Sequence, residues 1–289
     1  MEAITWIECP RDAMQGYASV FRTEDKIAYL RRLMAVGFDY LDLASFVSPK
    51  AIPQMFDSVQ VLDALAPDKG LNKFLVIAAN SQGIDAALAH EAVDAVGVPF
   101  SISPKFQIRN TKRSQEYALD DWAASMERLH ASDKQLVVYL SMAFGNPYGE
   151  AYSIDLVAKW TARVVNRFQP HVLSISDTVG SASPEGIRSV VSVVRQESGT
   201  AKLGLHLHMS AANALSNGLL DAAWDSGIRR YDSALLGLGG CPYAQNELVG
   251  NLPTEALLTF ATARGATFGI KPLALESAHN AAREFFNYI

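Results

Sequence analysis

The chain has 289 residues, with 25 Lys and Arg against 30 Asp and Glu, which gives a formal net charge of −5. Because no Lys- or Arg-rich block stands out, binding to nucleic acid or to an anionic membrane surface is not expected. The two cysteines, Cys9 and Cys241, are too few for a disulfide framework. With no apparent targeting segment or transmembrane run, the sequence favours a cytoplasmic protein.

Short apolar runs alternate with amphipathic stretches along the whole chain. In chain order, the periodicity predicts eight strands, each followed by a helix. The expected pairs are strand 4–8 and helix 24–36, 40–44 and 60–66, 74–79 and 84–95, 97–102 and 114–130, 135–141 and 153–167, 172–176 and 184–197, 203–208 and 211–226, and 230–235 and 254–263.

Several helix ends carry recognisable signals. Ser153 and Thr254 stand where N-caps are expected, because their hydroxyls can accept from free amides of the first turn. Gly37 and Gly227 follow predicted helices, where a left-handed residue often ends the helix.

Strand followed by helix, eight times over, indicates parallel strands joined by crossover helices. We predict a closed (β/α)8 TIM barrel, with 1–289 forming a single catalytic domain. An open doubly wound sheet is the alternative, but no Gly-rich dinucleotide loop follows the first strand. Residues from about 267 form a C-terminal extension, helical over 275–286.

In such a barrel the chemistry lies at the C-terminal ends of the strands. His206 and His208 are two residues apart on a predicted strand, so both imidazoles face the same side. Such a pair suits a metal, although two histidines bonded to the backbone are the simpler reading. Asp12, after the first strand, is either a turn residue or the anionic ligand that completes the pair. Arg11 beside it is a surface ion-pair partner or a fixed cation for a developing enolate oxygen.

The segment 237–243 reads Gly-Leu-Gly-Gly-Cys-Pro-Tyr. Its three glycines indicate a pliable loop, of the kind that moves over a ligand. Cys241 on this loop is either an inert buried thiol or a group placed for proton transfer.

With these residues in view, the sequence resembles the 3-hydroxy-3-methylglutaryl-CoA lyase family over nearly its whole length. The matching motifs are Pro-Arg-Asp with a following Gln at 10–15, Ser-Phe-Val-Ser-Pro-Lys at 45–50, Asp-Thr-Val-Gly at 177–180, Gly-Leu-Gly-Gly-Cys-Pro-Tyr-Ala at 237–244 and Gly-Asn at 250–251.

The resemblance implies metal-dependent cleavage of 3-hydroxy-3-methylglutaryl-CoA to acetyl-CoA and acetoacetate, a step of leucine degradation and ketone-body formation. It implies that a divalent cation, Mg²⁺ or Mn²⁺ before Zn²⁺ because the ligand set has no thiolate, is held by Asp12, His206, His208 and Asn251. It further implies a small-molecule acyl-CoA substrate and a homodimer. The expected catalytic residues are Arg11, Asp42, Asp177 and Cys241, and the expected substrate-binding residues are Gln15, Ser45, Ser48, Asn110 and Ser141.

The sequence departs from the family pattern at four places. Ala13-Met14 stand where the first-strand motif usually has Gly-Leu, and the spacing from Cys241 to Asn251 is one residue longer than expected. Asp42 stands where the family usually has Glu, and Met209-Ser210-Ala211-Ala212 replaces its Asp-Thr-x-Gly. These departures leave open an aldolase or lyase for a related 3-hydroxy acid or its CoA ester. A Claisen-type condensing synthase and a catalytically dead binding protein are further alternatives. The synthase is disfavoured by Cys241-Pro242, where such enzymes have Glu-Arg, and the binding protein by the retained ligand set.

Overall fold

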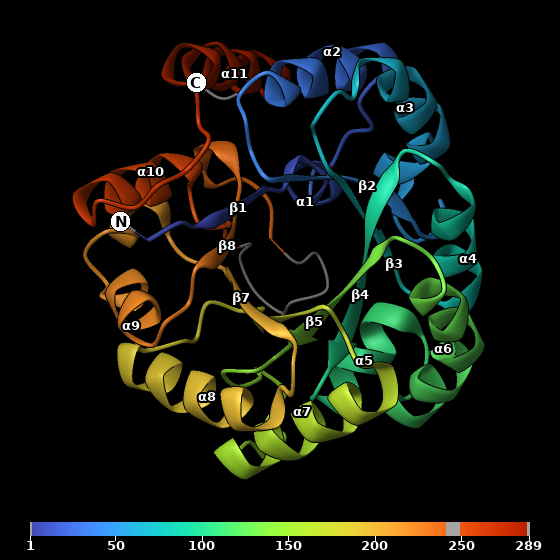
Figure 1. Ribbon diagram of the computed structural model, residues 1–289, viewed down its shortest axis with the longest axis vertical. Coiled ribbons are helices and arrows are strands. Elements are labelled where there is room, and N and C mark those ends of the chain that lie inside the picture. Colours follow the sequence, from blue (N-terminus) through green and yellow to red (C-terminus); the bar gives the residue numbers. More distant parts are fainter. Residues whose placement is uncertain (1, 241–248, 288–289) are drawn as a thin grey trace.

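The structure is a computed structural model and describes residues 2–240 and 249–287. Its parallel strands close into a barrel in chain order, with the helices arranged outside it (Figure 1), which confirms the predicted fold class. The strands are β1 (Thr5–Glu8), β2 (Tyr40–Phe46), β3 (Phe74–Ala78), β4 (Val93–Ser101), β5 (Gln135–Ser141), β6 (Val172–Asp177), β7 (Lys202–Leu207) and β8 (Arg230–Ser233).

The helices follow the predicted alternation, with two additions. The α-helices are α1 (Pro10–Gln15), α2 (Thr23–Met34), α3 (Ser58–Leu65), α4 (Ser81–Ala89), α5 (Pro104–Thr111), α6 (Gln115–His130), α7 (Ile154–Phe168), α8 (Pro184–Glu197), α9 (Leu219–Asp225), α10 (Thr254–Ala263) and α11 (Pro272–Phe285). The short helices α1 and α5 were not predicted; they lie in the segments that follow β1 and β4. None of the described helices is long and apolar enough to cross a membrane.

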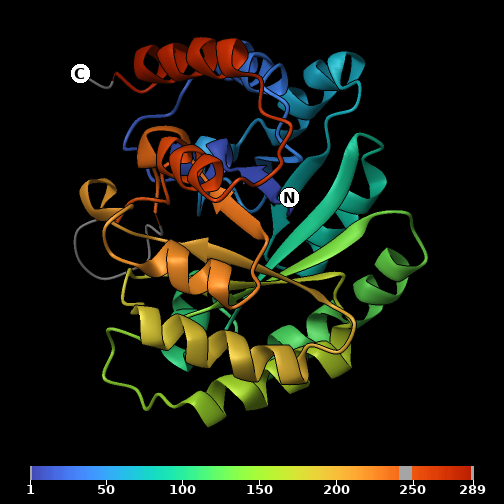
Figure 2. The same cartoon turned by 60° about the vertical axis from the view of Figure 1, so that its left-hand side comes forward.

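The predicted C-terminal extension is α11, which lies beside α2 in both views (Figures 1 and 2). Aromatic rings fill the space between the two helices. Phe285 stacks on Phe21 with 4.2 Å between ring centroids and on Tyr29 with 4.8 Å. The extension therefore covers the first crossover helix.

Three sequence predictions were wrong at element ends. The helix predicted over 84–95 ends at Ala89, because Val93 pairs with Phe74 and already belongs to β4. The helix predicted over 211–226 begins only at Leu219, after Gly218 with a left-handed φ of 71°. Thr254 is not an N-cap; it is the first residue of α10, and its hydroxyl is hydrogen-bonded inside the protein.

Other end signals are confirmed. Ser153 caps α7 by accepting from the amide of Leu156 at 3.1 Å. Gly37 and Gly227 have φ values of 98° and 80°. These are conformations in which glycine carries no steric penalty from a side chain.

The barrel closes where β1 pairs with β8, with Thr5 opposite Arg230 and Glu8 opposite Ser233. Alternate strand residues point inward and form an apolar plug: Ile7, Cys9, Tyr40, Leu75, Ile77, Ala95, Val137, Tyr139 and Val172. Gly97 of β4 makes room in this plug. A Cβ there would lie 2.8 Å from the Tyr139 ring and 2.6 Å from Ile77, so glycine allows the Tyr139 ring to lie across the barrel.

Candidate active site

Arg11 is a buried cation at the mouth of the barrel, placed by α1, where Pro10 starts the helix. Its Nε and Nη2 donate to the two carboxylate oxygens of Asp42 at 3.1 and 2.5 Å, and its Nη1 donates to Asp12 at 2.9 Å. Burial disfavours the charged form, but the two carboxylates outweigh it and raise the pKa of Arg11. The guanidinium is therefore permanently charged and held in one orientation.

Asp42 on β2, one of the expected catalytic residues, is a direct partner of Arg11. The shorter side chain still reaches the guanidinium with both oxygens. Burial raises the pKa of Asp42 to about 6, in opposition to the attraction of Arg11.

Asp12, His206 and His208 form a compact group of candidate metal ligands. The two Nε2 atoms are 3.1 Å apart, and the Nε2 of His208 is 3.9 Å from a carboxylate oxygen of Asp12. One donor atom from each residue lies within 4.8 Å of the others. A carboxylate oxygen and two imidazole nitrogens at this spacing fit a divalent cation, with room for substrate oxygens to complete its shell.

The far nitrogen of each imidazole has a fixed partner. Nδ1 of His206 lies 3.2 Å from a carboxylate oxygen of Asp232, and Nδ1 of His208 lies 3.0 Å from the carbonyl of Thr178. Such contacts orient both rings with Nε2 toward the cluster. Burial, with the neighbouring His206, lowers the pKa of His208 to about 4, so its ring is neutral and can accept a metal.

The other two members of the cluster favour their charged forms. Burial acts against charge on Asp12, but Arg11 and His206 outweigh it and hold the pKa of the carboxyl well below its usual range. Burial likewise acts against charge on His206, but its hydrogen bond with Asp232 raises the pKa. The Asp12 carboxylate is therefore ionised at neutral pH, as a metal ligand would have to be.

Asn251 lies directly against this cluster. Its Nδ2 donates to Asp12 and to the carbonyl of Leu238, both at 2.7 Å. Gly239, with a φ of 98°, permits this approach, because a Cβ there would lie 2.5 Å from the Asn251 amide nitrogen. Asn251 presents its amide nitrogen to Asp12, so binding of a metal by Asn251 requires its amide oxygen to turn inward.

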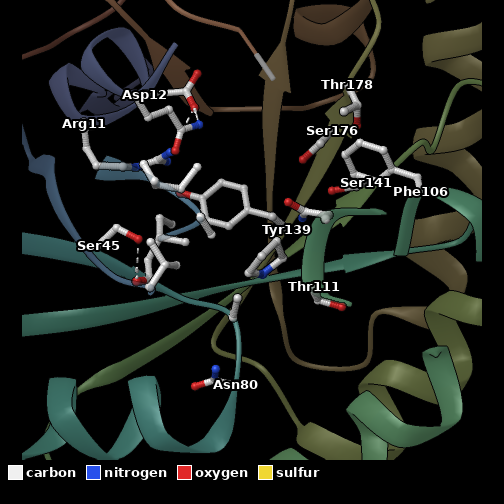
Figure 3. A pocket seen from close by; sticks show the side chains of 18 of the residues that line it. Arg11, Asp12, Ser45, Asn80, Phe106, Thr111, Tyr139, Ser141, Ser176 and Thr178 are labelled. Carbon is white, nitrogen blue, oxygen red and sulfur yellow. Dashed lines mark hydrogen bonds and ion pairs between the residues drawn. The ribbon is translucent and has the colours of Figure 1, made fainter. Parts of the chain in front are cut away.

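A cavity of about 270 Å³ opens beside these residues (Figure 3). The five expected substrate-binding residues line it: Gln15, Ser45, Ser48, Asn110 and Ser141. Arg11, Asp12, His206 and His208 line the same cavity, and much of the remaining wall is apolar, with Val47, Ile52, Ile77, Ala79 and Phe106. Polar groups thus meet at one end of a largely apolar cavity, an arrangement typical of small-molecule sites.

Asp42 and Asp177 are expected catalytic residues that are not among the described residues lining the cavity. Asp177 at the end of β6 accepts from the amides of Ser181 and Ala182, each at 2.9 Å, so its carboxylate shapes the turn that follows. Its neighbour Thr178 does line the cavity. Cys241 lies outside the described residues.

The sequence reasoning missed Asp232, Tyr139 and Lys112. Asp232 carried a usable signal, because an acid in a strand that is otherwise buried must have a partner. Tyr139 and Lys112 carried none, since a strand tyrosine and a loop lysine are ordinary residues until the fold places them at the cavity.

Comparison with known proteins agrees with this geometry. The model of the HMGL-like family matches residues 3–281. Human mitochondrial hydroxymethylglutaryl-CoA lyase is 32% identical over 271 residues, which are 94% of this chain and 82% of the human protein. A Pseudomonas aeruginosa lyase for 3-hydroxy-3-isohexenylglutaryl-CoA and hydroxymethylglutaryl-CoA is 32% identical over 249 residues, 86% of this chain and 81% of that protein.

Solved structures of HMG-CoA lyases have the same fold as this chain. The HMG-CoA lyase of Acinetobacter baumannii, in complex with coenzyme A and 3-methylmalate, superposes with a TM-score of 0.87 at 27% identity, covering 99% of this chain and 92% of that one. The Bacillus subtilis HMG-CoA lyase gives a TM-score of 0.89 at 27% identity, covering 99% and 95%. Because the family model matches residues 3–281, almost the whole of this chain, the chain belongs to the HMGL-like family.

Proposed function

We propose that the chain is a hydroxymethylglutaryl-CoA lyase, which cleaves 3-hydroxy-3-methylglutaryl-CoA to acetyl-CoA and acetoacetate with a divalent cation. The observation that carries this proposal is the meeting of the Arg11–Asp42 pair with the Asp12, His206 and His208 cluster at one cavity. The names of the relatives, and the coenzyme A in one related structure, support the acyl-CoA substrate.

Asp12, His206 and His208 would hold the cation, with Asn251 as a fourth ligand once its amide turns. Mg²⁺ or Mn²⁺ is proposed before Zn²⁺, because the set contains no thiolate. A bound cation supplies Lewis acidity: it polarises the tertiary hydroxyl of the substrate and lowers the pKa of that hydroxyl.

Cleavage places negative charge on the thioester oxygen of the departing acetyl-CoA enolate. Arg11 is proposed to hold that oxygen, because its guanidinium is buried and fixed before the substrate arrives. Asp42 orients Arg11, and Gln15, Ser45, Ser48, Asn110 and Ser141 position the acyl group. Cys241 is proposed to transfer a proton to the enolate carbon, which balances the proton that the tertiary hydroxyl loses on cleavage, so the overall reaction needs no added proton. Asp177 is proposed to act by shaping the turn that presents Thr178.

The proposal extends to the setting of the enzyme. We infer a cytoplasmic homodimer, and the proposed reaction belongs to leucine degradation and ketone-body formation.

The direct test is to incubate the protein with 3-hydroxy-3-methylglutaryl-CoA and Mg²⁺ or Mn²⁺ and to identify products by mass spectrometry. Acetyl-CoA and acetoacetate are expected in equal amounts, and a chelator should stop their formation. Arg11→Lys keeps the charge but loses the fork that grips Asp42, so turnover should fall. Arg31→Lys, in an exposed ion pair with Asp68, is the matched control. Folded protein that yields no acetyl-CoA with either cation would overturn the proposal.

A further inference from the structure

A thiol, an imidazole and a carboxylate lie together inside the barrel, on Cys9, His206 and Asp232. One candidate ligand atom from each of these residues lies within 4.8 Å of the other two. Nδ1 of His206 lies 3.2 Å from a carboxylate oxygen of Asp232, whereas Nε2 of the same ring lies 3.1 Å from Nε2 of His208. The His206 ring therefore stands between two groups of candidate ligands and belongs to both.

Adjacent strands of the barrel bring the three side chains together. Strand β8 lies between β1 and β7 (Figure 1), and in its register Asp232 stands opposite both Ile7 and His206. Cys9 follows Ile7 by two residues, and alternate residues of a strand face the same side. The Cys9 thiol therefore shares the apolar plug of the barrel with Ile7 and faces the interior.

The group is buried and can balance the charge of a divalent cation. Cys9 is 1% exposed and Asp232 is 2% exposed. One oxygen of Asp232 accepts from Nη1 of Arg230 at 3.3 Å, which fixes the carboxylate while its other oxygen faces His206. The thiol has a weaker anchor, because its Sγ lies 4.0 Å from the carbonyl of Ile7. A cation that replaces the thiol proton gains a thiolate, and together with the Asp232 carboxylate this thiolate neutralises two positive charges.

We propose that Cys9, Asp232 and Nδ1 of His206 form a second metal site, which takes a thiophilic divalent cation such as Zn²⁺, Co²⁺ or Cd²⁺ and excludes the catalytic cation. A thiolate favours these ions over Mg²⁺ and Mn²⁺, which prefer oxygen ligands. Ligand atoms of a tetrahedral zinc site lie roughly 3–4 Å apart. Shifts of about 1 Å would thus close the three atoms around an ion, with a fourth position left for water.

The exclusion follows from the chemistry of the shared imidazole. A neutral imidazole has one nitrogen that carries a proton and one that offers a lone pair. In the proposed catalytic arrangement Nε2 of His206 offers the lone pair and Nδ1 donates its proton to Asp232. A cation bound by Nδ1 moves the proton to Nε2, so His206 can no longer serve the catalytic cluster. The second site does not depend on the proposed reaction, but the exclusion rests on the proposed catalytic ligand set.

The cavity gives a cation its route to the second site. His206 lines the cavity, and 12% of its side chain is exposed. Rotation of this ring is the movement that admits a small ion to Cys9 and Asp232 behind it. A purely structural Cys9, packed as an apolar filler of the plug, would make no bond to any ion.

The first test adds Co²⁺ to the metal-free protein and records the near-ultraviolet absorption that arises only from a direct thiolate–cobalt bond. Native protein should develop this band, and Cys9→Ala should not. Cys241→Ser is the matched control, because Cys241 is the other thiol of the chain, and it should keep the band. Cys9→Ser, which is close to native in size, answers the same question should Cys9→Ala fail to fold.

The second test measures affinity and exclusion. In isothermal titration calorimetry, Cys9→Ala should weaken Cd²⁺ binding by at least about tenfold and leave Mn²⁺ binding unchanged. When Cd²⁺ is added to native protein loaded with Mn²⁺, Mn²⁺ should be released, as followed by the electron paramagnetic resonance signal of the free ion. Cys9→Ala should require at least about tenfold more Cd²⁺ for the same release.

Four results would overturn the inference. They are no thiolate band in the native protein, a band that persists in Cys9→Ala, a band that is lost in Cys241→Ser, and a Cys9→Ala variant that weakens Mn²⁺ as much as Cd²⁺. A band that forms while Mn²⁺ stays bound would refute the exclusion. None of these measurements uses turnover, so a Cys9-dependent band in a protein that does not cleave 3-hydroxy-3-methylglutaryl-CoA would support the second site and refute the proposed reaction.

Discussion

Glu8 is a buried acid that should make the stability of the protein depend on pH. It ends β1 on the outer side of the barrel, fully buried, where one carboxylate oxygen accepts from the amide of Leu235 at 2.7 Å and the other from the hydroxyl of Thr254 at 2.5 Å. No ion pair to Glu8 is formed among the described residues. Burial therefore outweighs these hydrogen bonds and raises its pKa from 4.5 to about 8.

Because the folded protein favours the protonated form of Glu8, its stability falls as pH rises. In the unfolded chain Glu8 ionises near its ordinary pKa, whereas in the folded protein it stays protonated up to about pH 8. Its contribution to stability is complete below pH 4.5 and is lost as pH rises to about 8. Each pH unit in that window costs at most about 1.4 kcal/mol of unfolding free energy.

The perturbation is Glu8→Gln, which keeps the shape and an acceptor for the Leu235 amide but does not titrate. Urea unfolding of both proteins at pH 5.5, 7.0 and 8.5, with chelator present to remove metal linkage, gives the difference in unfolding free energy. The native protein should lose stability relative to the variant as pH rises, by a few kcal/mol over this range.

Glu197→Gln, at the exposed end of α8, is the control, and its difference from the native protein should stay constant. A Glu8→Gln difference that is flat across the three pH values would refute the reasoning. It would mean that Glu8 ionises alike in the folded and unfolded states.

Three further predictions concern the active site. Asp42→Asn removes the negative charge that pairs with Arg11 and helps to orient it, so kcat should fall by about 10²-fold in steady-state assays. Full activity of this variant would exclude an orienting role for Asp42. His208→Gln should weaken Mn²⁺ binding by at least about tenfold in calorimetry, with the fold intact by circular dichroism; unchanged affinity would remove His208 from the ligand set. Cys241→Ser should fold and bind metal but turn over about 10²–10⁴-fold more slowly. It should also abolish inactivation by thiol oxidants, because the other thiol, Cys9, is buried; full activity in this variant would contradict the proton-transfer role.

The sequence was sufficient to predict the barrel, because its signal is periodic and repeated. Strand β5 and helices α8 and α10 were predicted at their observed ends. The failures lie where two signals overlap. The apolar residues before Gly97 continue a helical pattern but pair with β3, since tertiary pairing outweighs local preference. The helices α1 and α5 are too short to show a period of their own.

The site could be predicted only in part, for a physical reason. His206 and His208 share a face because they are two residues apart, and the structure brings them together. The contacts that orient them come from β8 and from the turn after β6, and no local pattern reveals such long-range partners. Lys112 shows the same limit, since its place depends on a left-handed residue after an unpredicted helix.

The seam between β1 and β8 has a consequence for how the site is assembled during folding. Asp12 follows the first strand, His206 lies on the seventh and His208 directly after it, and Asn251 follows the eighth. During synthesis from the N-terminus, the proposed ligand set is therefore incomplete until Asn251, which follows the last strand of the barrel, has left the ribosome. A metal that binds only the closed barrel stabilises that state in proportion to its free concentration over its Kd. Metal supply and closure of the first strand against the last are then thermodynamically linked, and a chain truncated before β8 should neither close nor retain the cation.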